Sequence, residues 1–595
     1  MNYKIRIPRV PTVSPTVLAL FALGLSSLSL QAAENQRPNV ILVLTDDQGY
    51  GDFSVHGNPV LQTPVLDKLH DRSIRFTDFH VAPMCTPTRA QLLTGRDAVD
   101  NGATAVCMGR SMPREDLPMM ADIFKASGYR TAHFGKWHLG DSYPYRPQDR
   151  GFEESVTFGA FGIGSIADWY GNTYWSANFR HSGAMQRSEG YCTDVWFDMA
   201  LDYLEDWKEG SDPFFLYLPT NCPHDPHLCD DRYSDPYLAK GIDPVVAKFF
   251  GQIANIDENM GRLLDRLDQS GLADNTLLIY MSDNGTAKGH SVFNAGMRGS
   301  KKDPYDGGHR VPLFIRWPSG NLGAPRDIET LTQCQDILPT LIDWCKLQIP
   351  KEADFDGSSL APLLSEDPDA LNDRMLVVEY DNPYRPGDNK AVMWKKWRLV
   401  KGRELYDISV DPGQATDVAG KHPEVVRHMQ SYYQQWKQEA MQGYNQKRLI
   451  HLGSEAQNPL MLYSSDWQGD YADNINNLVA GDRIGSWDVS VEQPGMYEFT
   501  LSRWHPASGL ALTESIKDAR GRGRGAIPVK QARLKIGAFD QTVSTTADQT
   551  DVKFRVELPK GNHKVETWLM DADGQPLCSA YYTQAEHVHR VADTD

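Results

Sequence analysis

The chain has few cysteines and no excess of positive charge. Eight cysteines occur among 595 residues, and no two of them have the C-x-x-C spacing of a zinc knuckle. Lys and Arg number 60 and Asp and Glu 78, which gives a formal net charge of −18. A disulfide-rich scaffold is therefore excluded, and a general nucleic-acid-binding protein would usually have the opposite charge. If the ligand is an anion, the positive charge that attracts it must be local, inside a pocket.

Apart from its first segment, the chain also lacks an apolar run long enough to span a bilayer. Basic residues precede an apolar run over residues 17–23, and the small residues Ala32 and Ala33 follow it. This order is typical of a cleaved secretory signal peptide, and serines interrupt the run too often for a membrane anchor. We therefore expect residues 1–33 to be a signal peptide, the mature protein to be periplasmic or secreted, and no stable membrane insertion.

The cysteines allow two interpretations. Cys222 and Cys229 are close enough in sequence for a local disulfide bond, and so are Cys334 and Cys345. Buried reduced side chains would explain the same residues equally well. The sequence leaves both interpretations open.

The composition, with 41% hydrophobic and 23% charged residues, is that of an ordinary globular protein, and 595 residues are too many for one core. Continuous apolar runs predict strands buried on both faces, as in a parallel sheet with helical crossovers. These runs cover residues 39–44, 129–134, 214–218 and 276–281, with helical periodicity between them at 195–207 and 245–267. The alternation predicts a doubly wound, mostly parallel α/β domain over residues 34–345.

Two further regions have different patterns. Short apolar segments between residues 376 and 400, followed by a helical pattern, predict a smaller antiparallel sheet-plus-helix subdomain over residues 346–452. Over residues 453–595, segments that alternate with period two are separated by Pro/Gly turns, which predicts an appended β-sandwich domain. This domain is either carbohydrate-binding or a brace on the catalytic domain. The basic, glycine-rich stretch 518–525 is typical of a flexible loop.

Polar residues directly follow the predicted strands, at the sheet edge where such folds bind ligands. Asp46 and Asp47 follow the first strand, and Asp283 and Asn284 follow a later one. An adjacent Asp pair alone is more often a turn or a helix cap, but its position after a buried strand favours a site. Oxygen donors without a thiolate or an imidazole favour Ca²⁺ or Mg²⁺ over zinc.

The sequence from Cys85 to Arg96, CTPTRAQLLTGR, matches every fixed position of the pattern C-x-P-x-R-x-x-x-L-T-G-R. In this it resembles the type I, arylsulfatase-like sulfatases of the alkaline phosphatase superfamily, and the resemblance spans most of residues 38–440. It implies an alkaline-phosphatase-like α/β fold. It also implies that a formylglycine-generating maturation enzyme oxidises Cys85 to formylglycine (3-oxoalanine). The hydrate of that aldehyde has one hydroxyl that attacks sulfur and a second that expels sulfate.

The resemblance further implies a metal site. Asp46, Asp47, Asp283 and Asn284 would bind one divalent ion, usually calcium, and an oxygen of the modified Cys85 would complete its shell. The ion would polarise the sulfate and lower the pKa of the attacking hydroxyl.

Five other residues match positions of the family's motifs. They are Arg89 in the cysteine motif, Lys136 and His138 in GKWH, His224 in PHDP and Lys301 in RGSK. By resemblance, Arg89 would hold the hydrated aldehyde, and Lys136 and Lys301 would bind sulfate oxygens. His138 would drive the elimination of sulfate, and His224 would protonate the leaving sugar oxygen.

Some neighbouring residues have no such position. We expect His227 and His309 either to be structural or to support the site residues, and not to be catalytic. Asp306 replaces the glutamate of the family's E-G-G-x-R-V-P pattern conservatively. The aromatic insertion 167–175 either stacks on sugar rings or packs over the sheet.

An exported sulfatase with an appended β-sandwich most often belongs to a polysaccharide-degrading system. We therefore expect a sulfated carbohydrate substrate, from an algal polysaccharide or a glycosaminoglycan. Two alternatives are a phosphomonoester or phosphonate hydrolase of the same superfamily and a sulfated-glycan-binding protein without catalysis. The oxygen-only metal set disfavours the first, and retention of every motif position disfavours the second.

Overall fold

The computed structural model describes residues 37–588, except 208, 209, 211, 365, 366, 368, 382–386, 388 and 518–522. The predicted signal peptide lies outside the described residues, and so does most of the predicted flexible loop 518–525. Within the described part of the chain, no helix combines the length and the apolar character needed to cross a bilayer.

A ten-stranded mixed sheet forms the centre of the α/β region. In order across the sheet, its strands are β11 (Arg326–Ile328), β2 (Ile74–Phe76), β10 (Leu313–Arg316), β9 (Thr276–Ser282), β1 (Asn39–Thr45), β8 (Phe214–Pro219), β4 (Arg130–Gly135), β5 (Glu154–Thr157), β6 (Asn178–His181) and β7 (Ala184–Arg187). Neighbouring strands from β9 to β5 are parallel. The four strands predicted from apolar runs are confirmed as β1, β4, β8 and β9 and form this parallel centre.

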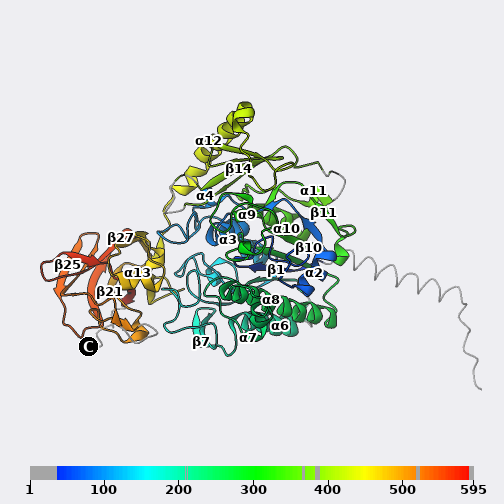
Figure 1. Ribbon diagram of the computed structural model, residues 1–595. Helices are drawn as coiled ribbons and strands as arrows, with labels where there is room; N and C mark the ends of the chain where they lie inside the picture. Colours follow the sequence, from blue (N-terminus) through cyan, green and yellow to red (C-terminus); the bar gives the residue numbers. More distant parts are fainter. Residues whose placement is uncertain are drawn as a thin grey trace, which may run out of the picture. The chain divides into compact units, whose positions relative to one another are not determined.

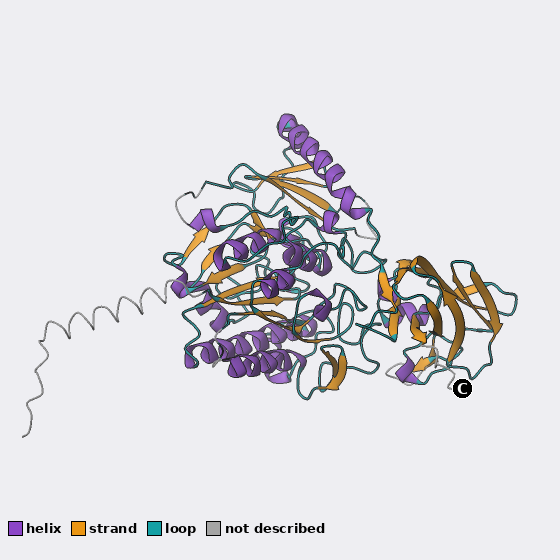
Figure 2. Cartoon of the chain, turned by 180° about the vertical axis from the view of Figure 1, so that it is seen from behind, coloured by secondary structure: helices purple, strands orange, loops and turns teal. Residues whose placement is uncertain are grey.

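Helices cover both faces of the sheet (Figures 1 and 2). Those that matter most for the site and the cores are α3 (Cys85–Thr94), α6 (Cys192–Trp207), α8 (Pro244–Gln269) and α10 (Ile337–Cys345). The predicted helices are confirmed as α6 and α8. Asp243 caps α8, because its carboxylate accepts hydrogen bonds from the amides of Val245 (2.9 Å) and Val246 (3.3 Å), and Pro244 begins the helix.

Strand β1 separates two hydrophobic cores because alternate side chains of a strand point to opposite faces. Val40 and Leu42 pack in a core that includes side chains of α3 and α10. Ile41 and Val43 pack in a second core, with side chains of α6 and α8. Both faces of β1 therefore pack in a hydrophobic core, which explains the continuous apolar run in the sequence.

The predicted smaller subdomain is confirmed as an antiparallel sheet with a helix. Its strands are β13 (Met375–Glu379), β14 (Lys390–Trp394), β15 (Trp397–Val400) and β16 (Glu404–Asp407). The helix α12 (Pro423–Tyr444) packs on this sheet through a shared cluster that contains Leu399, Leu405 and Met429.

Two antiparallel sheets form the predicted β-sandwich. The larger sheet contains β17 (Ile450–Leu452), β19 (Gln468–Gly469), β20 (Gly485–Val491), β24 (Gln531–Ile536), β25 (Phe539–Ser544), β27 (Gly561–Met570) and β28 (Pro576–Cys578); its only parallel pair, among the described strands, is β17 with β20. The smaller contains β18 (Leu460–Tyr463), β21 (Gly495–Ser502), β26 (Asp551–Leu558) and β29 (Tyr582–Val588). Side chains of both sheets, such as Val489 and Phe499, share one core. Because β17 lies before the expected boundary at residue 453, residues 450–588 are called the C-terminal sandwich below.

All eight cysteines are buried, and Cys222, Cys229 and Cys334 are free thiols. The disulfide interpretation of both local cysteine pairs is therefore wrong, and the interpretation as buried side chains holds.

Candidate active site

The carboxyl ends of the parallel strands place the predicted site residues at one edge of the sheet. Leu44 pairs with Pro219 and Thr45 with Ser282, so the loops after β1, β8 and β9 begin side by side. The loop after β4 joins them, because the amide of Lys136 donates a hydrogen bond to the carbonyl oxygen of Pro219 at 2.7 Å. The residues that follow all four strands therefore meet at this edge.

Gly135, the last residue of β4, is required by this close approach. Its φ is +129°, and a Cβ at this position would lie 1.9 Å from the carbonyl oxygen of Pro219. Any other residue would push the backbone of the following loop away from β8, and with it Lys136 and His138.

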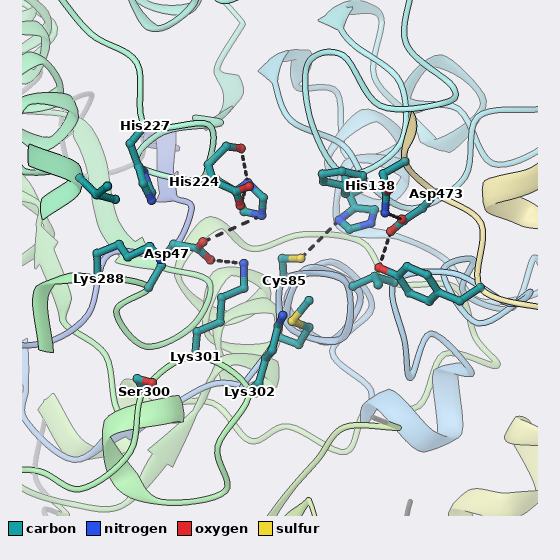
Figure 3. A pocket seen from close by; sticks show the side chains of 18 residues that line it. Asp47, Cys85, His138, His224, His227, Lys288, Ser300, Lys301, Lys302 and Asp473 are labelled. Carbon is teal, nitrogen blue, oxygen red and sulfur yellow. Dashed lines mark hydrogen bonds and ion pairs between the residues drawn. The ribbon is translucent and has the colours of Figure 1, made fainter. Parts of the chain in front are cut away.

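Cys85 is the first residue of α3, and all ten residues of this helix are buried. Its Sγ lies 3.4 Å from Nδ1 of His138, as Figure 3 shows. Burial raises the pKa of the Cys85 thiol, although Lys136 and Lys301 lower it. As an unmodified thiol, Cys85 is therefore neutral near pH 7 and a weak nucleophile.

Three cationic side chains with little or no exposure each contact one buried carboxylate at the site. The pairs are Arg89 with Asp283 (2.8 Å), Lys136 with Asp46 (2.6 Å) and Lys301 with Asp47 (2.6 Å). The formal charges of these six groups cancel. A divalent cation among them would make the site positive in a chain whose net charge is −18.

Two oxygen atoms of this cluster, Asp46 Oδ1 and Asn284 Oδ1, are buried and have no hydrogen-bond partner among the described residues. Asp47 and Asp283 are adjacent to them: Asn284 Nδ2 donates to Asp47 Oδ1 at 2.8 Å, and the amide of Asp47 donates to Asp283 Oδ1 at 3.1 Å. A buried oxygen without a partner is costly, and hard cations prefer such ligands. The four predicted metal ligands are therefore neighbours, and the two oxygens without a partner are of the kind that a divalent ion prefers. The ligand atoms of Asp46, Asp47 and His224 also lie close enough together to hold an ion, so an imidazole adjoins the predicted oxygen ligands.

Burial and neighbouring charges shift the pKa values of Asp283 and Asp47 in opposite directions. Burial and the charge of Asp46 raise the pKa of Asp283 to about 7, although Arg89 lowers it. Burial would also raise the pKa of Asp47, but Lys301 and His224 outweigh it and hold this pKa well below its usual range. A cation at the cluster would favour the ionised form of Asp283.

Asp47 and His138 have φ values of 76° and 61°, in the left-handed region that residues other than glycine rarely adopt. Such strain collects at functional sites, where the surrounding structure holds it. A second group of buried titratable residues, Asp78, His80 and Asp306, has no such feature and is bridged internally by Arg398.

His138 and His224 lie on either side of Cys85 in Figure 3. Burial and Lys136 lower the pKa of His138 well below its usual value, and burial and Lys301 lower the pKa of His224 to about 4. Both rings are therefore neutral near pH 7. Nδ1 of His224 lies 2.7 Å from the carbonyl oxygen of Asp225, and its Nε2 lies 3.9 Å from Asp47 Oδ2.

These side chains surround a pocket with a volume of about 470 Å³. The predicted site residues that line it are Asp47, Cys85, His138, His224 and Lys301. The other predicted site residues are fully buried, namely Asp46, Arg89, Lys136, Asp283 and Asn284. Five of the ten predicted site residues thus line the pocket, and Asp47 and Lys301 among them also belong to the buried charge cluster.

Sequence reasoning missed several polar residues of the pocket wall. They are Asp225, Lys288, Ser300 and Lys302 from loops of the α/β region and Tyr471, Asp473 and Asn474 from the C-terminal sandwich. Asp225, Ser300 and Lys302 adjoin residues that were predicted, so motif neighbourhood could have found them. The sandwich residues belong to no motif and carried no signal. His227 also lines the pocket, with Nδ1 3.1 Å from Gln252 Oε1.

His309 and the aromatic insertion 167–175 contact residues outside the pocket. Nδ1 of His309 lies 2.9 Å from Nδ1 of His80, away from the pocket residues, as expected for a structural histidine. In the aromatic insertion, Trp169 and Tyr170 pack against His505 of the C-terminal sandwich, with ring centroids 5.4 and 6.3 Å apart. These two rings therefore contact the C-terminal sandwich, not the sheet as the packing interpretation had it, and Tyr170 remains 40% exposed.

The sequence model of the sulfatase family matches residues 38–347, more than half of the chain. The chain belongs to the sulfatase family. A second model, described as the C-terminal region of N-sulphoglucosamine sulphohydrolase, matches residues 300–440 of this sulfatase. Both matches end before the C-terminal sandwich begins.

Curated relatives support the assignment. An N-acetylgalactosamine-6-sulfatase of Mus musculus is 29% identical to this sulfatase over 444 residues, which cover 69% of this chain and 82% of the relative. An N-acetylgalactosamine-6-O-sulfatase of Bacteroides thetaiotaomicron is 27% identical over 482 residues, 66% of this chain and 92% of the relative. The crystal structure of Ps i-CgsB in complex with k-i-k-neocarrahexaose has a TM-score of 0.63 at 25% identity and covers 69% of this chain and 95% of its own. The protein is thus a sulfuric ester hydrolase with a sulfatase fold.

Proposed function

We propose that this sulfatase removes sulfate from a sulfated saccharide after export from the cytoplasm, with formylglycine made from Cys85 and one divalent ion, Ca²⁺ or Mg²⁺. One observation carries the proposal: the cysteine of a complete CTPTRAQLLTGR motif lies in one pocket with His138, His224 and Lys301. The named relatives support a saccharide, since their names refer to N-acetylgalactosamine sulfate and, in Formosa agariphila, to ulvan. The signal-like segment at residues 1–33 supports export.

The chain's own charges can bind the sulfate group. Asp46, Asp47, Asp283 and Asn284 would hold the ion, which would polarise a sulfate oxygen. The ammonium groups of Lys136 and Lys301 lie 2.6 Å from two of these carboxylates, so they lie beside the proposed ion site. Cations fixed before the substrate arrives stabilise the charge of the transition state without reorganisation.

The two histidines can move protons on either side of residue 85. Formylglycine in its hydrated form would supply one hydroxyl for attack on sulfur and another for release of sulfate. His138 has Nδ1 3.4 Å from the side chain of residue 85 and is placed to accept a proton there. His224, on the other side of Cys85, would donate a proton to the leaving sugar oxygen. This donation needs the protonated ring, which the negative charge of a bound ester favours.

The test combines chemistry at residue 85 with turnover. The enzyme, co-expressed with a formylglycine-generating enzyme, should show the aldehyde at residue 85 by peptide mass spectrometry and release sulfate from defined sulfated oligosaccharides. Cys85→Ala should retain the fold and lose turnover. The matured wild-type enzyme should hydrolyse 4-nitrophenyl sulfate faster than 4-nitrophenyl phosphate. An active enzyme with an unmodified thiol, or a preference for the phosphate, would sink the proposal.

A further inference from the structure

A short segment of the C-terminal sandwich forms one side of the catalytic pocket. Tyr471, Asp473 and Asn474 line it, from the stretch between β19 and the helix α13 (Ile475–Ala480). Figure 3 shows Asp473 on the same side of the pocket as His138, whereas His227 and Lys288 lie on the opposite side. A domain that only braced the catalytic domain would have no reason to place polar side chains there.

Contacts with the α/β region fix this segment. The amide of Ile166 donates to the carbonyl oxygen of Asp473 at 3.1 Å, and the amide of Ala472 contacts Cys107 Sγ at 3.5 Å. Tyr471 packs on a cluster that contains Cys85 itself. The distance between the segment and the reacting centre is therefore set by packing on both sides.

The Asp473 carboxylate is held in place with part of its bonding capacity unused. Oδ2 accepts a hydrogen bond from the Tyr471 hydroxyl at 2.6 Å, and Oδ1 accepts one from Asn474 Nδ2 at 2.8 Å. The residue is only 2% exposed, and no ion pair to Asp473 occurs in the part of the chain that the structure describes. Each oxygen of a carboxylate can accept two hydrogen bonds, so one position on each remains for a ligand.

We propose that Asp473, oriented by Tyr471 and Asn474, binds the saccharide by accepting hydrogen bonds from neutral O–H or N–H groups beside the reacting sulfate. The inference rests on the proposed function and adds a selectivity to it. An ionised carboxylate only accepts, so the bound part of the substrate must donate, as sugar hydroxyl and acetamido groups do. A second sulfate or a uronate carboxylate at this position would be repelled.

The segment that carries Tyr471, Asp473 and Asn474 lies outside both family matches, which end at residues 347 and 440. The α/β region therefore supplies the groups that act on any sulfate ester, and the C-terminal sandwich supplies contacts that depend on the rest of the substrate. Hydrolysis of esters whose organic part has no O–H or N–H group, such as 4-nitrophenyl sulfate, should not depend on Asp473.

The test is Asp473→Asn in the full, matured enzyme. Asparagine keeps the shape and the local bonds, because its oxygen can accept from Asn474 and its amide can donate to Tyr471. The probes are N-acetylgalactosamine 6-sulfate, carrageenan and ulvan oligosaccharides, and 4-nitrophenyl sulfate. For the sugar sulfate that the wild type cleaves fastest, we expect kcat/KM to fall about 10- to 100-fold, the range for a lost hydrogen bond to a charged group. For 4-nitrophenyl sulfate, we expect a change of less than about 3-fold.

Asp466→Asn is the matched control. Asp466 is also a buried aspartate of the C-terminal sandwich that contacts the α/β region, through the amide of Asp141 (3.3 Å), but it does not line the pocket. Its replacement should leave both kcat/KM values unchanged. Binding to the inactive Cys85→Ala enzyme gives a second measurement, in which Asp473→Asn should weaken oligosaccharide affinity about 10-fold by calorimetry.

The outcomes separate the two proposals. No sulfate release from any ester by the matured wild type defeats the proposed function, while weaker oligosaccharide binding in the Asp473→Asn, Cys85→Ala enzyme would still support the saccharide contact. Turnover with equal losses on sugar and aryl sulfates, no loss on sugars, or cleavage of the aryl ester alone overturns the role of Asp473.

Discussion

Arg89→Lys tests whether the buried charge cluster supports catalysis. Arg89 is fully buried and donates three hydrogen bonds. Nε (3.1 Å) and Nη2 (2.8 Å) donate to Asp283 Oδ2, and Nη1 donates to the carbonyl oxygen of Lys136 at 3.0 Å. Lysine keeps the charge, but one ammonium group cannot reproduce the planar fork that reaches both acceptors. Asp283 and the backbone at Lys136 should both lose support.

The magnitude follows from the bonds lost. If lysine keeps one of the three, two hydrogen bonds of a charged group disappear, each worth about 1.5–3 kcal/mol. We expect the free energy of unfolding to fall by about 3 kcal/mol, since solvent and relaxation restore part of the loss. Asp283 is a proposed metal ligand, and loss of a residue that orients a ligand typically lowers metal affinity or activity about 10- to 100-fold.

Arg398→Lys is the control for stability. Arg398 is also fully buried, with Nη2 donating to both oxygens of Asp78 (2.7 and 2.9 Å) and Nη1 to the carbonyl oxygen of Lys395 (2.8 Å). Neither Arg398 nor these partners line the pocket around Cys85. This variant should lose a similar stability, about 3 kcal/mol, and keep its kcat/KM for each folded molecule.

The assay measures thermal unfolding of both variants and kcat/KM for 4-nitrophenyl sulfate over a range of Ca²⁺ concentrations. Arg89→Lys should need more Ca²⁺ or remain less active when saturated. If the two variants lose stability equally and both retain wild-type activity and Ca²⁺ dependence, the reasoning about Arg89 is refuted.

Three further predictions concern the ion, the acid and the domain contact. Dialysis against EDTA should lower activity, and added Ca²⁺ or Mg²⁺ should restore it; full activity after prolonged chelation would exclude a catalytic role for the ion. His224→Ala should reduce kcat/KM more for sugar sulfates than for 4-nitrophenyl sulfate, whose leaving group hardly needs a proton, so equal losses would argue against the acid role. Burial and Asp141 raise the pKa of Asp466 from 3.8 to about 8, so the folded protein should lose stability as the pH rises from about 4 to 8. Asp466→Asn should reduce this pH dependence of the melting temperature, and an unchanged slope would contradict the assignment.

The sequence predicted those strands, helices and site residues whose signal lies within a short stretch of the chain. The apolar run of β1 could be recognised because both faces of that strand enter a core. Asp46 and Asp47 could be placed because a strand end in a parallel sheet fixes its neighbours. The family motif then connected these residues to Cys85, although α3 is separated from β1 by 39 residues along the chain.

Contacts between distant segments could not be predicted. Asp473 reaches the pocket through bonds such as the one from the amide of Ile166, which is more than 300 residues away in sequence. No periodicity or spacing near residue 473 encodes that neighbour. Sequence spacing could not decide between a disulfide bond and buried thiols for the two local cysteine pairs: the members of each pair share one hydrophobic cluster, Cys222 with Cys229 and Cys334 with Cys345, yet they are not bonded to each other.

The burial of α3 bears on whether residue 85 is oxidised before or after this helix folds. Every residue from Cys85 to Thr94 is buried in the folded protein, so an enzyme that recognised the residues around position 85 could not reach them there. If the oxidation occurs as we propose, it must precede folding of this segment. A molecule that folds first would keep its thiol permanently, and supplying the oxidising enzyme afterwards would not rescue it.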